Sequence, residues 1–234
     1  MNESDRSVGE LVDELSKKML PKYREIKCIF DNPYDYLALD PLRVEVCKCI
    51  IFDLHQAAIT LTNHLLEYSL KFCLGLKHSK DNKNDAKTLG DAFAAGVEKY
   101  DNMPLADTIN AACSQGLISK EQKKQLHEFR KDFRNAWSHA SSSKMFGDNT
   151  VPVGTVTTDD LNRLGLDGFI EHIFTSNDTI ETKIKNVPFI GAVIKARSSR
   201  NASIPYFRAV DAVIRAMLSN LSSSTQTRRA ADSH

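Results

Sequence analysis

Apolar residues recur at three- and four-residue steps from about Leu42 to Leu76, and this pattern constrains the fold more than any other feature of the sequence. Such steps place side chains on one face of an α-helix, and that face must be buried against partners. The residues concerned are Ile50, Leu54, Ala58, Leu61, Leu65, Tyr68 and Phe72. The pattern predicts one long helix, closed by Gly75 and the polar run KHSKDNKND.

Shorter helical segments flank this long helix. Residues 7–27 predict a first amphipathic helix that Pro21 interrupts, and Asp31–Pro41 a turn-rich connector. Another helix is predicted over residues 87–99. These segments can bury the apolar face of the long helix.

Two further helices are predicted on either side of Gly116, a natural C-terminal stop for Ala106–Gln115. Ser119 and Gln122 form a capping-box pattern at the start of the second one. The apolar stripe of that helix is most simply core packing, and it consists of Leu126, Phe129, Phe133 and Trp137.

Helical and extended signals mix in the C-terminal third. Residues 147–160 predict a loop with a short strand, and Thr158 and Asp159 a cap for a helix that begins near Leu161. Pro205 is expected to start the final amphipathic helix, after a basic loop over Ala196–Ser203. The cations in and beside that loop form a local basic patch: Lys195, Arg197 and Arg200.

These segments together predict an all-α fold, because the strand signals are too few for an α/β sheet. We expect an N-terminal helix and connector over residues 1–41 and a helical domain over residues 42–222. This domain contains a loop-rich insertion at about 147–204, and a disordered tail follows over residues 223–234.

Charge and cysteine content exclude several classes of function. The net charge of +1 predicts no bulk attraction to nucleic acid or anionic lipid, so any such site must be a local patch. The five cysteines are odd in number, and Cys47 and Cys49 have no second pair at zinc-site spacing, so we expect no disulfide framework, metal or cofactor. The charged N-terminus and the lack of a membrane-length apolar run predict a cytoplasmic protein with no membrane association.

Arg134, Asn135 and His139 bring a permanent cation, an amide and a side chain that titrates near neutrality into six residues. Arginine can bind phosphate through a planar fork of donors, and histidine can transfer protons at cellular pH. The spacing alone proves little, because Arg229 and His234 repeat it in the polar tail. In the alternative interpretation, Arg134 caps carbonyls or pairs with a nearby carboxylate, and His139 merely ends the helix.

Two segments resemble HEPN domains, the higher-eukaryote and prokaryote nucleotide-binding family. Residues 63–76, NHLLEYSLKFCLGL, are similar to the second helix of that family. Residues 116–140, GLISKEQKKQLHEFRKDFRNAWSHA, are similar to the third, in which an arginine and a polar residue precede a histidine. The resemblance covers about residues 42–145 and implies an antiparallel helical bundle.

The resemblance implies a metal-independent endoribonuclease of the kind found among toxins and antiviral-defence effectors, cleaving RNA through a 2′,3′-cyclic phosphate. Arg134 would bind the phosphate, Asn135 would orient the imidazole and His139 would transfer protons. His64 and Arg130 are candidates for a supporting or substrate-binding role. A homodimer would join two copies of the motif in one cleft, and an antitoxin or sensor protein would restrain it.

Alternatives remain open at this stage. Some family members are non-catalytic modules that bind RNA or a nucleotide, and a helical protein-interaction domain would carry the same periodicity. Members paired with a nucleotidyltransferase antitoxin have a tyrosine two residues after the histidine. Ser141 occupies that position here, which argues against regulation by modification of such a tyrosine.

Overall fold

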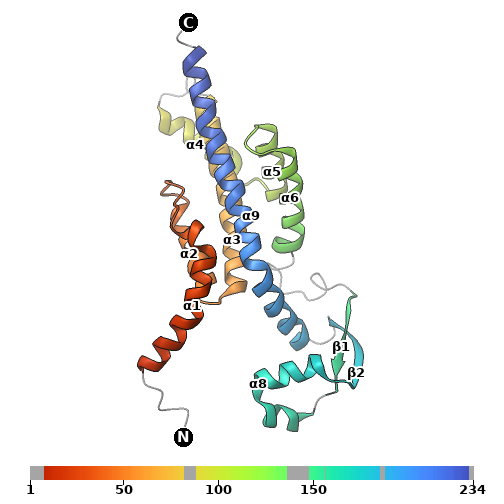
Figure 1. Cartoon of the computed structure of the whole chain (residues 1–234). Coiled ribbons are helices and arrows are strands. Elements are labelled where there is room, and N and C mark those ends of the chain that lie inside the picture. The colour runs from red at the N-terminus through yellow and green to blue at the C-terminus, as the bar shows by residue number, and fades with distance from the viewer. Residues whose placement is uncertain (1–7, 82–87, 136–147, 156, 185–187, 232–234) are drawn as a thin grey trace.

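The computed structural model describes residues 8–81, 88–135, 148–155, 157–184 and 188–231. Helices dominate these residues, and the only sheet among them is a two-stranded hairpin, which confirms the all-α class (Figure 1). The elements are α1 (Val8–Phe30), α2 (Asp40–Ile51), α3 (His55–Asp81), α4 (Leu89–Asp101), α5 (Leu105–Ser114), α6 (Lys120–Phe129), the π-helix η2 (Arg130–Asn135), β1 (Thr150–Gly154), α8 (Thr158–Thr175), β2 (Thr179–Lys183) and α9 (Pro188–Ala231).

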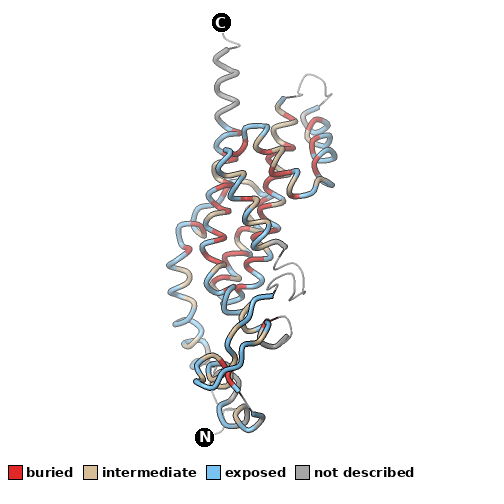
Figure 2. The backbone as a smooth tube through the Cα atoms, turned by 90° about the vertical axis from the view of Figure 1, so that its right-hand side faces the viewer, coloured by how far each residue is buried: buried red, intermediate tan, exposed pale blue. Residues whose placement is uncertain are grey.

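Helices α3 and α9 form the centre of the bundle and run in the same direction. His55 Nδ1 lies 2.7 Å from Ser203 Oγ near the start of α3, and Lys80 Nζ donates to the Leu221 carbonyl at 2.9 Å near its end. The antiparallel arrangement expected for the bundle therefore does not describe this pair. Buried residues concentrate along the two helices, while the hairpin and α8 are largely exposed (Figure 2).

The single long helix predicted from Leu42 to Leu76 is wrong, because a sharp turn separates α2 from α3. Asp53 adopts a left-handed conformation, with φ of 66°. Its N–H donates to the Ile50 carbonyl, and the N–H of Leu54 donates to the Cys49 carbonyl. These two bonds form a Schellman motif, which terminates α2. Aspartate tolerates the left-handed region better than most residues, but it gives a weaker stop signal than glycine.

Two prolines predicted to mark helix boundaries instead lie inside helices. Pro21 is within α1, and Pro205 is within α9, which also includes the predicted basic loop Ala196–Ser203. A proline removes one intrahelical hydrogen bond and leaves a carbonyl free four residues earlier. Both prolines are exposed, so water can solvate the freed carbonyls. Helix α9 also extends to Ala231, through residues expected to be a disordered tail.

Several end signals are confirmed where the side chain and backbone agree. Gly116 has φ of 69° after α5, and Ser119 and Gln122 form a complete capping box at α6. The predicted short strand is β1, which pairs antiparallel with β2. The cap of α8 is Thr157 with Asp160, rather than the predicted Thr158 and Asp159.

Gly75 does not end α3 as predicted, because it lies where α3 crosses α4. A Cβ atom added to Gly96 would lie 2.8 Å from the Gly75 carbonyl oxygen, closer than real Cβ contacts allow. Gly75 and Gly96 therefore let the two backbones touch. The role of Gly75 is to permit packing rather than to terminate the helix.

Replacing Gly96 with alanine is expected to destabilise the protein by about 1–3 kcal/mol, the range for overpacking a close contact. Gly90→Ala on the same helix is the matched control, since its Cβ would meet Thr88 Oγ1 at an ordinary 3.5 Å. We expect that control to be neutral or slightly stabilising. Urea unfolding of both variants measures the difference, and equal effects would contradict the close crossing of α3 and α4.

Candidate functional site

The predicted motif begins in η2, a π-helix that continues α6. Arg134 and Asn135 are the last two residues of η2, and the structure describes their backbone but not their side chains. Trp137 and His139 lie outside the described residues. Short π-helical segments within helices often occur at functional sites, because the inserted residue shifts the following side chains. The helix thus departs from α geometry at the residues where the motif was predicted.

An aromatic cluster holds this segment against α9. The Phe133 ring stacks on the Tyr206 ring with centroids 4.1 Å apart and an interplanar angle of 10°. Phe129 meets Tyr206 edge-on at 5.1 Å. The Tyr206 hydroxyl then donates to Asn63 Oδ1 of α3 at 2.7 Å. One side chain of α9 therefore connects the motif helix to the centre of the bundle.

Two buried polar groups beside this cluster lack hydrogen-bond partners among the described residues. They are the Asn63 amide nitrogen, in a residue only 8% exposed, and Arg130 Nε. An unsatisfied buried donor costs about 1–3 kcal/mol. Such groups are uncommon in stable folds and frequently reflect a binding role. Both lie on the elements that position the predicted motif.

The predicted supporting residues occupy different environments. Arg130 is half-buried in the first turn of η2, whereas His64 is exposed on α3 next to Asn63. The predicted ion pair of Glu67 with Lys71 is confirmed, at 3.2 Å. Contacts between α3 and η2 bring the two helix faces together. No distance from His64 or Arg130 to His139 follows from the described residues.

Asn63 and Tyr206 were not predicted as site residues. Asn63 was noted only as the start of the family-like segment, and Tyr206 only as part of an apolar stripe. A polar residue at a buried position of α3 was the available signal for Asn63. Nothing local to Tyr206 identifies its partner, which is 143 residues away in the chain.

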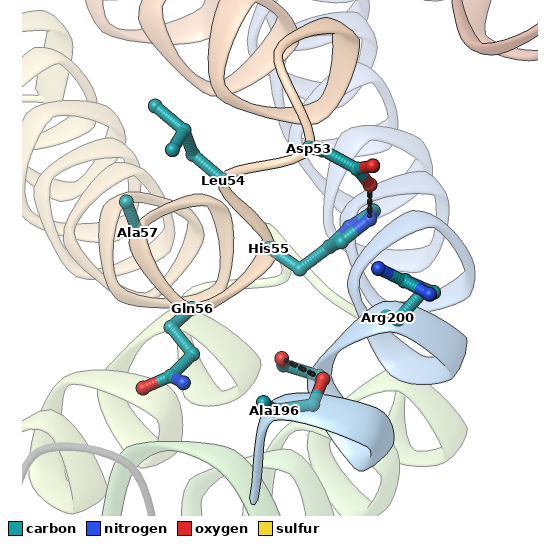
Figure 3. Close-up of a pocket in the computed structure, with 8 residues that line it drawn as sticks. Asp53, Leu54, His55, Gln56, Ala57, Ala196 and Arg200 are labelled. Atoms are coloured by element: carbon teal, nitrogen blue, oxygen red, sulfur yellow. Dashed lines mark hydrogen bonds and ion pairs between the residues drawn. The ribbon is translucent and has the colours of Figure 1, made fainter. Parts of the chain in front are cut away.

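A separate pocket of about 380 Å³ lies at the start of α3 (Figure 3). One wall is the turn before α3 together with its first residues, and the other is α9. In Figure 3 the Arg200 side chain of α9 extends toward the Asp53–His55 pair across the pocket. The lining consists of Asp53, Leu54, His55, Gln56, Ala57, Ala196, Ser199 and Arg200.

His55 is held on both sides by hydrogen bonds and is 6% exposed. Its Nε2 lies 2.5 Å from Asp53 Oδ1, and its Nδ1 lies 2.7 Å from Ser203 Oγ. The set resembles the serine, histidine and aspartate of hydrolases. However, Ser203 is only 1% exposed and bonds to Nδ1, so its hydroxyl is not presented to a substrate. His55 therefore serves to position its neighbours.

Two cations from other helices border this network. Lys22 of α1 forms an ion pair with Asp53, and Arg200 is close enough to both Lys22 and His55 to affect their protonation. Burial lowers the pKa of His55 below its usual 6.5, and the charges of Lys22 and Arg200 lower it further. We expect His55 to be neutral at pH 7, with its Nε2 proton donated to Asp53 and its Nδ1 accepting from Ser203.

The lowered pKa of His55 predicts a pH-dependent stability. The unfolded chain binds the proton at higher pH than the folded chain, so folding is favoured above about pH 6.5. The free energy of unfolding should fall as the pH drops below 6.5, and level off below the folded pKa. Urea unfolding between about pH 5 and pH 8 measures this slope.

His55→Gln should flatten that slope, and His64→Gln should leave it unchanged. Part of the slope should persist, since burial and then Arg130 also lower the pKa of His127. An unchanged slope in His55→Gln would contradict the proposed neutral state of His55.

The cysteines offer no reactive centre. All five are free, and Cys47 and Cys73 are buried. Burial raises the pKa of each of these two thiols to about 12, so neither forms a thiolate at cellular pH. Among the described residues, no group of histidine, cysteine and carboxylate side chains could hold a metal ion.

Comparison with known proteins leaves the assignment to geometry and chemistry. No protein-family model matches the chain, and neither the curated proteins nor the solved structures give a match. In the described part of the chain, none of the helices combines the length and apolar character needed to cross a bilayer.

Proposed function

We propose that this protein is a metal-independent endoribonuclease of the HEPN type, with its active site at the end of η2. The observation that supports the proposal is the π-helix Arg130–Asn135, which departs from α geometry where the motif begins. It is packed on α9 through Tyr206 and lies against α3. The unpartnered Asn63 and Arg130 groups beside it add polar donors suited to an anionic substrate.

The chemistry requires three events at one phosphate. The 2′-hydroxyl must lose a proton, the phosphorane must be stabilised, and the leaving 5′-oxygen must gain a proton. In this proposal Arg134 stabilises the phosphorane, His139 transfers protons and Asn135 orients the imidazole. Arg130 extends the phosphate contact, and His64 borders the site from α3.

A single histidine cannot act as acid and base at once, so the proposal includes a homodimer. A two-fold axis would place a second His139 in the same cleft, where one imidazole accepts a proton and the other donates one. RNA is the substrate, and the protein acts in the cytoplasm. An antitoxin or sensor protein would keep such an enzyme inactive until it is needed.

The second candidate function is a non-catalytic module that binds RNA or a nucleotide. The pocket at the start of α3 favours it, because Arg200 borders a cavity of about 380 Å³ and both ring nitrogens of His55 are already hydrogen-bonded. Such a module would bind through arginine side chains and would not need the imidazole of His139. The two candidates therefore differ in their response to loss of His139.

Expression in cells separates the two functions. The nuclease should slow growth and degrade cellular RNA, and His139→Ala should abolish both effects. Arg134→Ala serves as the second variant, since it impairs either function. Growth and RNA integrity that are the same for wild type and His139→Ala, at equal protein levels, would contradict the nuclease and favour the binding module.

A further inference from the structure

We propose that the pocket between the start of α3 and α9 is a second phosphate-binding site, which holds a phosphate of the RNA away from the scissile bond. This inference rests on the proposed function for the identity of the ligand. The site itself is inferred from the described residues alone. Arg200 is its principal ligand, and Lys22, Asp53 and His55 set its charge.

The charges around the pocket leave Arg200 without a counterion. Lys22 is paired with Asp53, whose carboxylate also accepts from His55. Glu25 influences Lys22 from α1 but does not line the pocket. Within the described chain, no hydrogen bond or ion pair joins Arg200 to another side chain. A guanidinium of this kind, at the border of a cavity, is well suited to bind a phosphate with two parallel hydrogen bonds.

Arg200 and Lys22 also repel one another across this space. Burial lowers the pKa of Lys22, and the charge of Arg200 lowers it further. His55 experiences both cations in the same way. An anion between Arg200 and Lys22 would relieve this repulsion, whereas a cation would increase it. The pocket therefore selects anions.

The remaining lining groups suit an oxygen-rich ligand. Gln56 is exposed at the pocket and carries an amide that can donate two hydrogen bonds. The first turn of α3 adds backbone N–H groups that its own helix does not use. Ser199 is not available, since its hydroxyl donates to the Ala196 carbonyl at 2.7 Å.

The pocket and the candidate active site share the same two helices. Asn63 is two helical turns after His55 on α3, about 12 Å along the axis. Tyr206, which contacts Asn63, follows Arg200 on α9 in the same direction. A single RNA strand can span this distance, because single-strand sites commonly hold several nucleotides. Occupation of the pocket would thus fix the register of the strand at the scissile phosphate.

The test compares Arg200→Gln with Arg197→Gln, a control on the same helix whose guanidinium lies over the Phe174 ring, 4.8 Å from its centroid. Both substitutions are made in full-length protein that also carries His139→Ala, so that no RNA is cut. The probes are a short fluorescent single-stranded RNA, measured by anisotropy, and inorganic phosphate, measured by calorimetry. Circular dichroism verifies that both variants are folded.

We expect Arg200→Gln to weaken RNA binding roughly tenfold, the effect of losing one charged hydrogen-bonding partner, while Arg197→Gln binds normally. A parallel loss of phosphate binding would show that the pocket accepts a free phosphate as well as one in the RNA backbone. A loss confined to RNA would restrict the site to the strand. Equal binding of both probes by the two variants would overturn the inference.

This result does not depend on catalysis. If wild-type protein cuts no RNA but Arg200→Gln still binds RNA more weakly than Arg197→Gln, the phosphate site stands and the nuclease proposal fails. If wild-type protein cuts RNA and both variants bind equally, the nuclease proposal stands and the phosphate site fails.

Discussion

His139→Ala and Arg134→Ala are each expected to reduce RNA cleavage by the purified protein by about two to four orders of magnitude. That range follows from the usual contribution of a general acid or base, and of one group that stabilises developing charge. The proposal gives both roles to these two side chains at the end of η2. Cleavage rates are measured on a labelled RNA in EDTA, with enzyme in excess, so that product release does not limit the rate.

The sequence supplies a matched control for this prediction. Arg229 and His234 have the same spacing as Arg134 and His139 but belong to the polar C-terminal segment. Arg229→Ala and His234→Ala should cleave RNA at the wild-type rate. A similar loss in both pairs, or in neither, would contradict a site at η2.

Arg43→Ala is expected to lower the free energy of unfolding by about 3 kcal/mol, since it removes one member of a buried charged network. Arg43 is 3% exposed and joins α1 to α2. Its Nη1 donates to the carbonyls of Ile29 and Phe30 at 2.6 and 3.0 Å, and its Nε donates to Asp40 at 2.8 Å. Loss of the guanidinium leaves the last carbonyls of α1 without these donors and a carboxylate without its ion pair.

Urea unfolding measures this effect, with Arg24→Ala as the control. Arg24 is an exposed residue of α1, and its loss should change the free energy of unfolding by less than about 0.5 kcal/mol. Arg43→Lys should restore only part of the stability, because an ammonium cannot reproduce the planar fork of donors. Arg43→Ala as stable as Arg24→Ala would show that the network does not hold α1.

Local signals predicted the parts of the fold that depend on local chemistry. The capping box of Ser119 and Gln122 and the left-handed Gly116 are confirmed, since both act within a few residues. The break at Asp53 was missed because apolar periodicity continues through it, and aspartate rarely ends a helix in this way. Pro205 was misread because proline is tolerated inside a helix when its freed carbonyl faces water.

The candidate site divides along the same line. A run of residues around Arg134 could be compared with a family, and the end of η2 now gives that run a structural setting. The Asn63–Tyr206 bond and the pocket around Arg200 could not be predicted, because each joins α3 to α9 across more than half of the chain. Such contacts depend on how helices pack, and a single sequence does not specify that packing.

The most direct test of the central claim is the chemical identity of the RNA ends that the purified protein leaves in EDTA. Attack by the 2′-hydroxyl predicts 2′,3′-cyclic phosphate ends from wild-type protein and no cleavage by His139→Ala prepared in parallel. Intact RNA with wild-type protein, 3′-hydroxyl ends, or equal cleavage by His139→Ala would contradict the proposed function.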